Sequence, residues 1–126
     1  MNLKFLVIDD SVTMRRIVIN SLKNLGYTDY IEACDGRDAL GKLAANPAIS
    51  FIITDWNMPV LSGLELTKAI RSDESFAKLP ILMVTTRGVK DDIIEALAAK
   101  VSGYIVKPFT PQVLKEKIEQ LLSKNK

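Results

Sequence analysis

The chain has 126 residues, of which 48% are hydrophobic and 25% are charged, and its formal net charge is +2. This length and composition predict a single folded domain over residues 1–126, monomeric and without an output domain of its own. The weak charge argues against nucleic acid as a partner, and the lack of a long apolar run or a signal-peptide pattern predicts a cytoplasmic protein that binds no membrane.

The amino-terminal half alternates predicted strands with predicted helices. A β-rich run over 4–8 is the first strand, and the helical apolar spacing that follows it ends at Gly26, a common helix stop. The run over 30–33 is the most polar strand candidate and suits the edge of a sheet. A second helix ends at Asn46-Pro47, and a third strand covers 51–54.

The carboxyl-terminal half continues this alternation. A third helix precedes the strand predicted over 80–85, and a fourth helix carries an apolar stripe formed by Ile93, Ile94, Leu97 and Ala98. A fifth strand is predicted over 103–106. Thr110-Pro111 then supplies a hydroxyl cap and a proline at the first position of the last helix.

The pattern is therefore (βα)5, which predicts an α/β fold. Right-handed crossovers between parallel strands place helices on both faces of the sheet. We expect a doubly wound, flavodoxin-like fold with five parallel strands in the order 2-1-3-4-5. Ligands of such sheets bind beyond the carboxyl ends of the strands, where the strand order reverses.

Polar residues stand at the carboxyl ends of four predicted strands. Asp9 and Asp10 follow the first strand, Asp55 follows the third, Thr85 ends the fourth, and Lys107 follows the fifth. In the order 2-1-3-4-5 the first and third strands are neighbours, so all five side chains are expected at one end of the sheet.

These residue types predict a magnesium site that supports phosphoryl transfer to a carboxylate. Three acids repel one another, and Mg²⁺, which prefers oxygen ligands, relieves that repulsion. Lys107 offers a cation and Thr85 a hydroxyl to a phosphoryl group. The chain has no histidine and one cysteine, Cys34, which excludes a disulfide within the chain, a Cys/His zinc site and Ser-His-Asp catalysis.

The ordered set of motifs resembles response-regulator receiver domains along the whole chain, and several motifs are similar to the chemotaxis branch of that family. They are Asp9-Asp10, Thr13 to Ile17, Asp55-Trp56-Asn57-Met58-Pro59, Ser62-Gly63, Thr85 and Gly103 to Phe109. The strand order used above is also that of the family, so fold and resemblance are not independent expectations.

The resemblance implies a role for each acid. Asp55 would accept a phosphoryl group from a histidine kinase, so the chain would be a phosphoacceptor that promotes its own phosphorylation and dephosphorylation and not a conventional enzyme. Asp10 and Asp55 would bind Mg²⁺ directly, together with the backbone carbonyl of Asn57, and Asp9 would act through a metal-bound water.

The resemblance also implies a switch and a partner surface. Thr85 would bond to the phosphoryl group, Lys107 would pair with it, and Tyr104 would move between outward and inward positions. On the residues alone, Tyr104 would be a packing tyrosine with a wet hydroxyl. Lys90, Tyr104 and Lys117 would lie on a face made by the fourth helix, fifth strand and fifth helix, which would bind the N-terminal peptide of a flagellar motor switch protein.

Further expectations concern the loops. Asn57 and Arg87 would tune the rate of phosphate loss, and Trp56 is expected to be half exposed beside the charged site. Lys100 stands where glycine is frequent in the family, and Leu61-Ser62 departs from its usual residues. The resemblance also predicts a cis Lys107-Pro108 bond, against the low base rate of cis peptides.

Three alternatives remain at this stage. A haloacid-dehalogenase-type phosphatase also uses Mg²⁺ and an aspartate, but it needs a second acid two residues after the nucleophile, where this chain has Asn57. A flavodoxin-like electron carrier needs a phosphate-binding loop where Asp9-Asp10 stand. The chain could also be a phosphate sink or relay intermediate. The sequence leaves open whether a dedicated phosphatase acts on it.

Overall fold

The structure of the protein is a computed structural model that describes residues 3–124. The strands form one parallel sheet in the order β2-β1-β3-β4-β5, which confirms the predicted doubly wound topology. Their bounds are β1 (Phe5–Ile8), β2 (Tyr30–Ala33), β3 (Phe51–Thr54), β4 (Ile81–Thr85) and β5 (Gly103–Val106).

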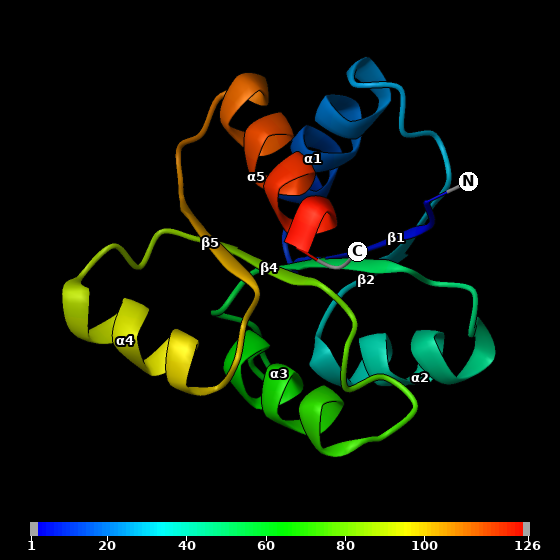
Figure 1. The fold of residues 1–126 in the computed structure, drawn as a ribbon, viewed down its shortest axis with the longest axis vertical. Coiled ribbons are helices and arrows are strands. Elements are labelled where there is room, and N and C mark those ends of the chain that lie inside the picture. The colour runs from blue at the N-terminus through cyan, green and yellow to red at the C-terminus, as the bar shows by residue number, and fades with distance from the viewer. Residues whose placement is uncertain (1–2, 125–126) are drawn as a thin grey trace.

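A helix follows each strand. The helices are α1 (Val12–Asn24), α2 (Gly36–Ala45), α3 (Gly63–Ser72), α4 (Lys90–Ala98) and α5 (Pro111–Lys124). Helices α1 and α5 cover one face of the sheet, and α2, α3 and α4 cover the other (Figure 1). Between residues 3 and 124 no helix combines the length and apolar character that crossing a membrane requires.

The element boundaries agree closely with the sequence patterns. Helix α1 is followed by Gly26 at φ 94°, and Asn46 caps the end of α2. Thr110 Oγ1 accepts a hydrogen bond from the Val113 N–H at the start of α5. Strand β4 begins one residue later than predicted, because Pro80 has no N–H to donate and contributes only its carbonyl, which accepts from Ile52.

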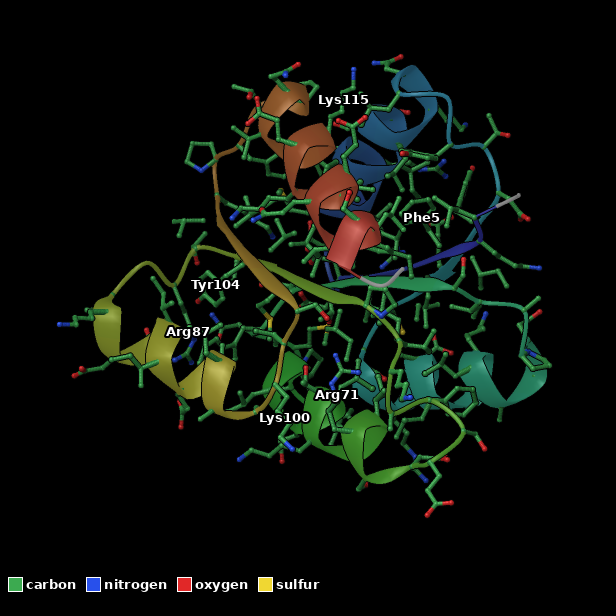
Figure 2. The ribbon with its side chains drawn as sticks, in the orientation of Figure 1. Phe5, Arg71, Arg87, Lys100, Tyr104 and Lys115 are labelled. Atoms are coloured by element: carbon green, nitrogen blue, oxygen red, sulfur yellow. The ribbon has the colours of Figure 1, made fainter. Side chains whose placement is uncertain are left out.

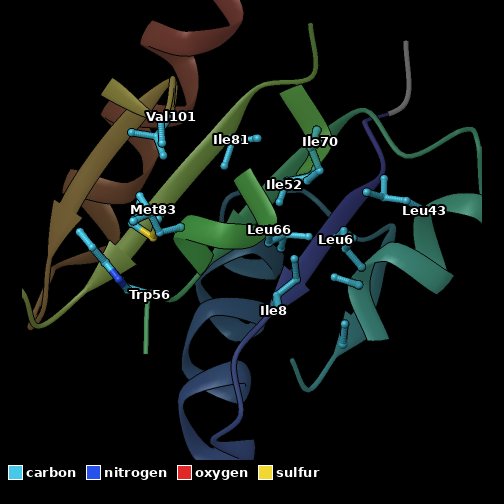
Figure 3. Packing of buried hydrophobic residues seen from close by; sticks show 14 of the residues in the cluster. Leu6, Ile8, Leu43, Ile52, Trp56, Leu66, Ile70, Ile81, Met83 and Val101 are labelled. Carbon is cyan, nitrogen blue, oxygen red and sulfur yellow. The ribbon is translucent and has the colours of Figure 1, made fainter. Parts of the chain in front are cut away.

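The core lies in two layers separated by the sheet. The layer under α2, α3 and α4 contains side chains from alternate positions of the central strands, including Leu6, Ile8, Ile52, Ile81 and Met83 (Figure 3). The layer under α1 and α5 contains the intervening side chains, such as Phe5, Val7, Phe51, Leu82 and Val84. This double burial explains why the strands are continuous apolar runs.

Helix α4 is the least buried of the described helices that carry an apolar stripe. Of its nine residues only Ala96 is fully buried, whereas the side chains of Ile94 and Leu97 are 52% and 53% exposed. The apolar stripe identified in the sequence therefore lies largely on the surface. Large exposed apolar side chains in a cluster mark candidate interaction surfaces.

Arg71, near the end of α3, forms hydrogen bonds with the turn between α4 and β5. Its guanidinium donates hydrogen bonds to the carbonyls of Lys100, Ala77 and Leu79 at 2.8–3.0 Å and to Ser102 Oγ at 3.2 Å. Burial lowers the pKa of Arg71. These bonds hold the chain where it enters β5, which carries Tyr104 and leads to Lys107.

The same turn contains a lysine in a conformation that favours glycine. Lys100 has φ 73° and directly follows Ala99, the last capping residue of α4. Its N–H bonds to the Leu97 carbonyl, and the Val101 N–H bonds to the Ala96 carbonyl, which is the pattern of a Schellman motif. A lysine instead of a glycine at position 100 therefore strains the backbone, because residues with a Cβ disfavour positive φ.

Lys100→Gly should stabilise the protein. Glycine adopts positive φ freely, and this relief outweighs the greater freedom that glycine gives the unfolded chain, so we expect about 0.5–1 kcal/mol in the free energy of unfolding. Lys115→Gly, in the exposed middle of α5, is the matched control and should destabilise by about 1 kcal/mol. Figure 2 shows both lysines. Urea unfolding of the two variants provides the comparison, and a loss of stability in Lys100→Gly would contradict the argument.

Candidate functional site

The three predicted acids meet beyond the carboxyl ends of β1 and β3. One carboxylate oxygen each from Asp9, Asp10 and Asp55 lie within 4.8 Å of one another. Asp9 is only 4% exposed, Asp55 is half-buried and Asp10 is exposed. The cluster thus has a buried floor and one side open to solvent.

The backbone fixes the orientation of two of these carboxylates. Asp9 Oδ1 accepts a hydrogen bond from the Ser11 N–H at 2.9 Å, and Ser11 in turn caps α1 by accepting from the Met14 N–H. Asp55 Oδ1 accepts from the Trp56 N–H at 2.6 Å. Bonds from peptide N–H groups stabilise the charged form of a carboxylate and hold its rotamer.

Lys107 lies at the predicted end of the sheet, where it contacts two of the acids. Its Nζ is 3.0 Å from Asp9 Oδ2 and 3.4 Å from Asp55 Oδ2, and its side chain is 9% exposed. The Lys107–Pro108 peptide bond is cis, which confirms that expectation. One buried cation therefore serves two carboxylates, and the exposed Asp10 has no such partner among the ion pairs of residues 3–124.

Thr85 ends β4 at the same edge of the sheet and is fully buried. Its Oγ1 accepts a long hydrogen bond of 3.4 Å from the Arg87 N–H. The neighbouring Thr86 is exposed and, with Lys107, lines an apolar pocket of about 390 Å³ beside Met14, Ile17 and Phe109. The structure therefore places both threonines near the site, and Thr85 is the one that continues the strand.

Arg87 makes contacts that the sequence did not reveal. Its guanidinium donates to Asn57 Oδ1 at 2.9 and 3.0 Å, lies 4.5 Å from the centre of the Trp56 ring, and is 3.5 Å from Asp92 Oδ1. Trp56 is 4% exposed, so the expectation of a half-exposed ring is wrong. The ring packs into the core beside Met83 (Figure 3). The Arg87 guanidinium lies over the ring.

Tyr104 connects the site to the surface of α4. Its hydroxyl donates a 2.6 Å hydrogen bond to the Arg87 carbonyl, and the two residues lie between α4 and the sheet (Figure 2). Burial raises the pKa of Tyr104, and the nearby Asp92 carboxylate raises it further. The hydroxyl is therefore a neutral hydrogen-bond donor at ordinary pH.

A groove of about 360 Å³ runs along α4, β5 and α5. Tyr104 and Lys117 both line it, together with the partly exposed apolar side chains of Ile93, Leu97 and Val106. The groove thus unites two of the three predicted partner-face residues. Lys90 is exposed at the first residue of α4 and is not one of the residues that line the groove.

Arg15, within the Thr13 to Ile17 motif, is a neighbour of the site to which the sequence pattern assigns no role. From α1 its guanidinium donates to the Asp9 carbonyl and pairs with Glu32 of β2 at 3.1 Å. It therefore ties the peptide that carries Asp9 to the edge strand. A single charged residue on a helix gives no sign of such contacts, because they depend on how helix and sheet pack.

Comparison with known proteins agrees with the family resemblance of the sequence motifs. The family described as "Response regulator receiver domain" matches residues 5–119. The chain is 56% identical over 123 residues to chemotaxis protein CheY1 of Helicobacter pylori, which covers 98% of this chain and 99% of that protein. Such identity over nearly the full length of both chains extends well beyond the site residues.

Solved structures agree with the sequence comparison. Chemotaxis protein CheY4 of Vibrio cholerae superimposes with a TM-score of 0.88 at 36% identity, covering 96% of this chain and 99% of that one. The receiver domain of sensor histidine kinase PA1611 from Pseudomonas aeruginosa, described with a magnesium ion coordinated in its active site cleft, gives a TM-score of 0.86 at 25% identity, covering 98% and 99%. The chain therefore belongs to the response-regulator receiver family, in its CheY-type chemotaxis branch.

Proposed function

We propose that this chain accepts a phosphoryl group on Asp55 in the presence of Mg²⁺ and then binds a partner through the groove along α4, β5 and α5. The observation that carries the first half is the convergence of three carboxylates within 4.8 Å with Lys107 beside two of them. Residues 1–126 contain no histidine, so the phosphorylated histidine of a donor kinase must lie outside them.

The donor set fits Mg²⁺. Oxygen ligands on a partly exposed edge suit a cation that keeps several waters, and no nitrogen or sulfur ligand from histidine or cysteine belongs to the cluster. Asp10, Asp55 and the backbone carbonyl of Asn57 would hold the ion directly, with Asp9 contacting it through water. The magnesium ion described in the related receiver domain of PA1611 supports this assignment. When bound, Mg²⁺ neutralises charge on the acids and on the transferred group.

The residues of the chain define the transfer step. An oxygen of Asp55 forms a bond to phosphorus while the bond between phosphorus and the donor breaks, and the donor leaves with that electron pair. Asp55 Oδ1 is held by the Trp56 N–H, so the side chain is already oriented. Lys107 can move from Asp55 to an oxygen of the new phosphoryl group while it keeps its shorter contact with Asp9. Thr85 would bond another phosphoryl oxygen.

Loss of the phosphoryl group would be tuned at the mouth of the site. Asn57 is exposed, and its side-chain amide oxygen accepts two hydrogen bonds from the Arg87 guanidinium. Together they would restrict the approach of an attacking water to Asp55. The chain alone could therefore set a basal rate of dephosphorylation, which a dedicated phosphatase would increase.

Acetyl phosphate provides the test of the acceptor function. Intact mass spectrometry should detect one phosphoryl group per chain when Mg²⁺ is present and essentially none when EDTA removes it, because the metal aligns and neutralises the phosphoryl group. Equal labelling with and without Mg²⁺ would contradict the proposed role of the metal.

Binding of Mg²⁺ itself should be weak and visible through Trp56. This residue is the only tryptophan and adjoins Asp55, so its emission should change as Mg²⁺ is added in the millimolar range. Asp10→Asn, which removes one charge from the site, should shift the titration to higher Mg²⁺ concentrations. Asp29→Asn, an exposed acid just before β2, is the control and should titrate like the wild type. An unchanged emission and an unchanged melting temperature would count against the site.

The partner surface suits an acidic amphipathic helix. The groove is apolar along Ile93, Leu97 and Val106, and Lys117 lies at its margin. By family resemblance the partner would be the N-terminal segment of a flagellar motor switch protein. A phosphoryl group that favours one arrangement of Thr85 and Tyr104 must raise the affinity of any partner that prefers the same arrangement.

Calorimetry with that peptide tests the partner function. Beryllofluoride with Mg²⁺, a phosphoryl mimic, should increase peptide affinity about 5–150-fold. Lys117→Glu should weaken binding, whereas Lys115→Glu, exposed on the same helix but outside the groove, should not. Equal affinities with and without the mimic would favour a phosphate sink or relay intermediate over a motor-binding output.

A further inference from the structure

We propose that Arg87 is a positioning residue that couples the phosphoacceptor loop to helix α4; the inference rests on the proposed function. Within residues 3–124, its side chain contacts both the loop after β3, at Trp56 and Asn57, and the first turn of α4, at Asp92. Its main-chain carbonyl accepts the Tyr104 hydroxyl. One residue thus links the phosphoacceptor loop, α4 and the groove tyrosine.

The geometry of the contacts explains why arginine suits this position. The guanidinium carbon lies 4.5 Å from the centre of the buried Trp56 ring, while Nε and Nη2 both donate to Asn57 Oδ1. A third donor, Nη1, remains for Asp92. A lysine could place one charge in this region but could not make the contact with the indole, the forked hydrogen bond and the ion pair together.

The link acts on groups that the phosphoryl reaction needs. Trp56 donates its N–H to Asp55, and Asn57 provides the carbonyl proposed for the metal. Both residues lie in the loop after β3 that the Arg87 guanidinium contacts. When Asp92 holds Arg87 in place, this loop is preorganised, so less ordering is needed when the metal and a phosphoryl group bind.

The magnitude is limited by exposure. The side chains of Arg87 and Asp92 are 38% and 25% exposed, and ion pairs of this kind contribute modestly. We therefore expect that loss of the Asp92 contact weakens the binding of a phosphoryl mimic about two- to fivefold. Loss of the whole arginine side chain should weaken it more, because the contacts with Asn57 and Trp56 are lost as well.

The matched control lies in the same turn of α4. Asp91 and Asp92 are adjacent acids at the amino terminus of this helix, but only Asp92 pairs with Arg87. Asp91→Asn therefore reproduces the loss of charge and the loss of a favourable interaction with the helix dipole. Any difference between the two asparagine variants reports the contact with Arg87.

The experiment is a double-mutant cycle on the full chain, read by titration of beryllofluoride in the presence of Mg²⁺. Asp92→Asn should lower the affinity two- to fivefold relative to Asp91→Asn, and this difference should vanish in the Arg87→Met background. Trp56 emission provides a second measure, since Arg87→Met removes the cation from the indole and should change the resting spectrum, with Arg87→Lys partly restoring it.

The outcomes separate this inference from the proposed function. A wild-type chain that does not bind beryllofluoride with Mg²⁺ would overturn the acceptor function itself. If the wild type binds beryllofluoride, the coupling is overturned when Asp91→Asn and Asp92→Asn bind it with equal affinity. It is also overturned when the effect of Asp92→Asn persists in the Arg87→Met background, or when Asp92→Asn increases the affinity for beryllofluoride. A selective decrease that depends on Arg87 would support it.

Discussion

Asp55→Asn should reduce phosphorylation by acetyl phosphate to background. The amide that replaces the carboxylate is a poor nucleophile, and the site also loses a charged oxygen that is proposed to bind Mg²⁺. The two neighbouring acids remain, but Asp9 is buried and already engaged by Lys107, and Asp10 is a proposed metal ligand. Neither is therefore expected to substitute for Asp55.

Stability measurements make the result interpretable. Asparagine has nearly the shape of aspartate, and Lys107 keeps its 3.0 Å contact with Asp9, so Asp55→Asn should remain folded with a melting temperature close to that of the wild type. Asp29→Asn should be labelled fully. Normal labelling of a folded Asp55→Asn variant would place the acceptor elsewhere and refute the assignment.

The fold could be predicted from the sequence because the three central strands, β1, β3 and β4, are buried on both faces. Such strands leave continuous apolar runs, and the helices between them leave helical periodicity, so the two element types are distinct in this chain. The site residues could be predicted for a related reason. Parallel strands all end at the same edge, so residues that follow the strands, such as Asp9, Asp55 and Lys107, meet there whatever the details of packing.

The features that escaped prediction depend on side-chain packing between distant segments. The apolar stripe of α4 gave the same pattern as a buried helix, although Ile94 and Leu97 lie on the surface. The burial of Trp56 depends on the core around Met83 and on the guanidinium of Arg87, which comes from a different loop. Periodicity records which side chains are apolar, but it does not record whether a neighbouring element covers them.

Gly63→Ala should be the most destabilising small substitution near the site. A Cβ on Gly63 would lie 2.0 Å from the Asp55 carbonyl oxygen, 2.9 Å from the Asp55 carbonyl carbon and 3.1 Å from the Trp56 Cα. All three are backbone atoms, so no side-chain rotation can relieve the clash. The Gly63 N–H also bonds to the Trp56 carbonyl at 2.9 Å, and this bond would have to lengthen.

We expect Gly63→Ala to lower the free energy of unfolding by about 3 kcal/mol, a large share of the stability of a small domain. Gly41→Ala is the matched control. Its Cβ would have no atom within 4 Å in the middle of α2, so the better helix former should stabilise the protein by about 0.5–1 kcal/mol. Chemical denaturation of both variants measures the difference, and similar stabilities would contradict the close approach of these two segments.

The same clash should affect the chemistry, because the atoms that must move belong to Asp55 and Trp56. A shift of the loop changes the direction of the Asp55 carboxylate relative to Lys107 and to the other acids, and phosphoryl transfer depends on such alignment. Folded Gly63→Ala should therefore be labelled by acetyl phosphate more slowly than the wild type, and its Trp56 emission should respond less to Mg²⁺. Wild-type labelling by a destabilised variant would show that the loop recovers its geometry, and the packing of Gly63 would then matter for stability alone.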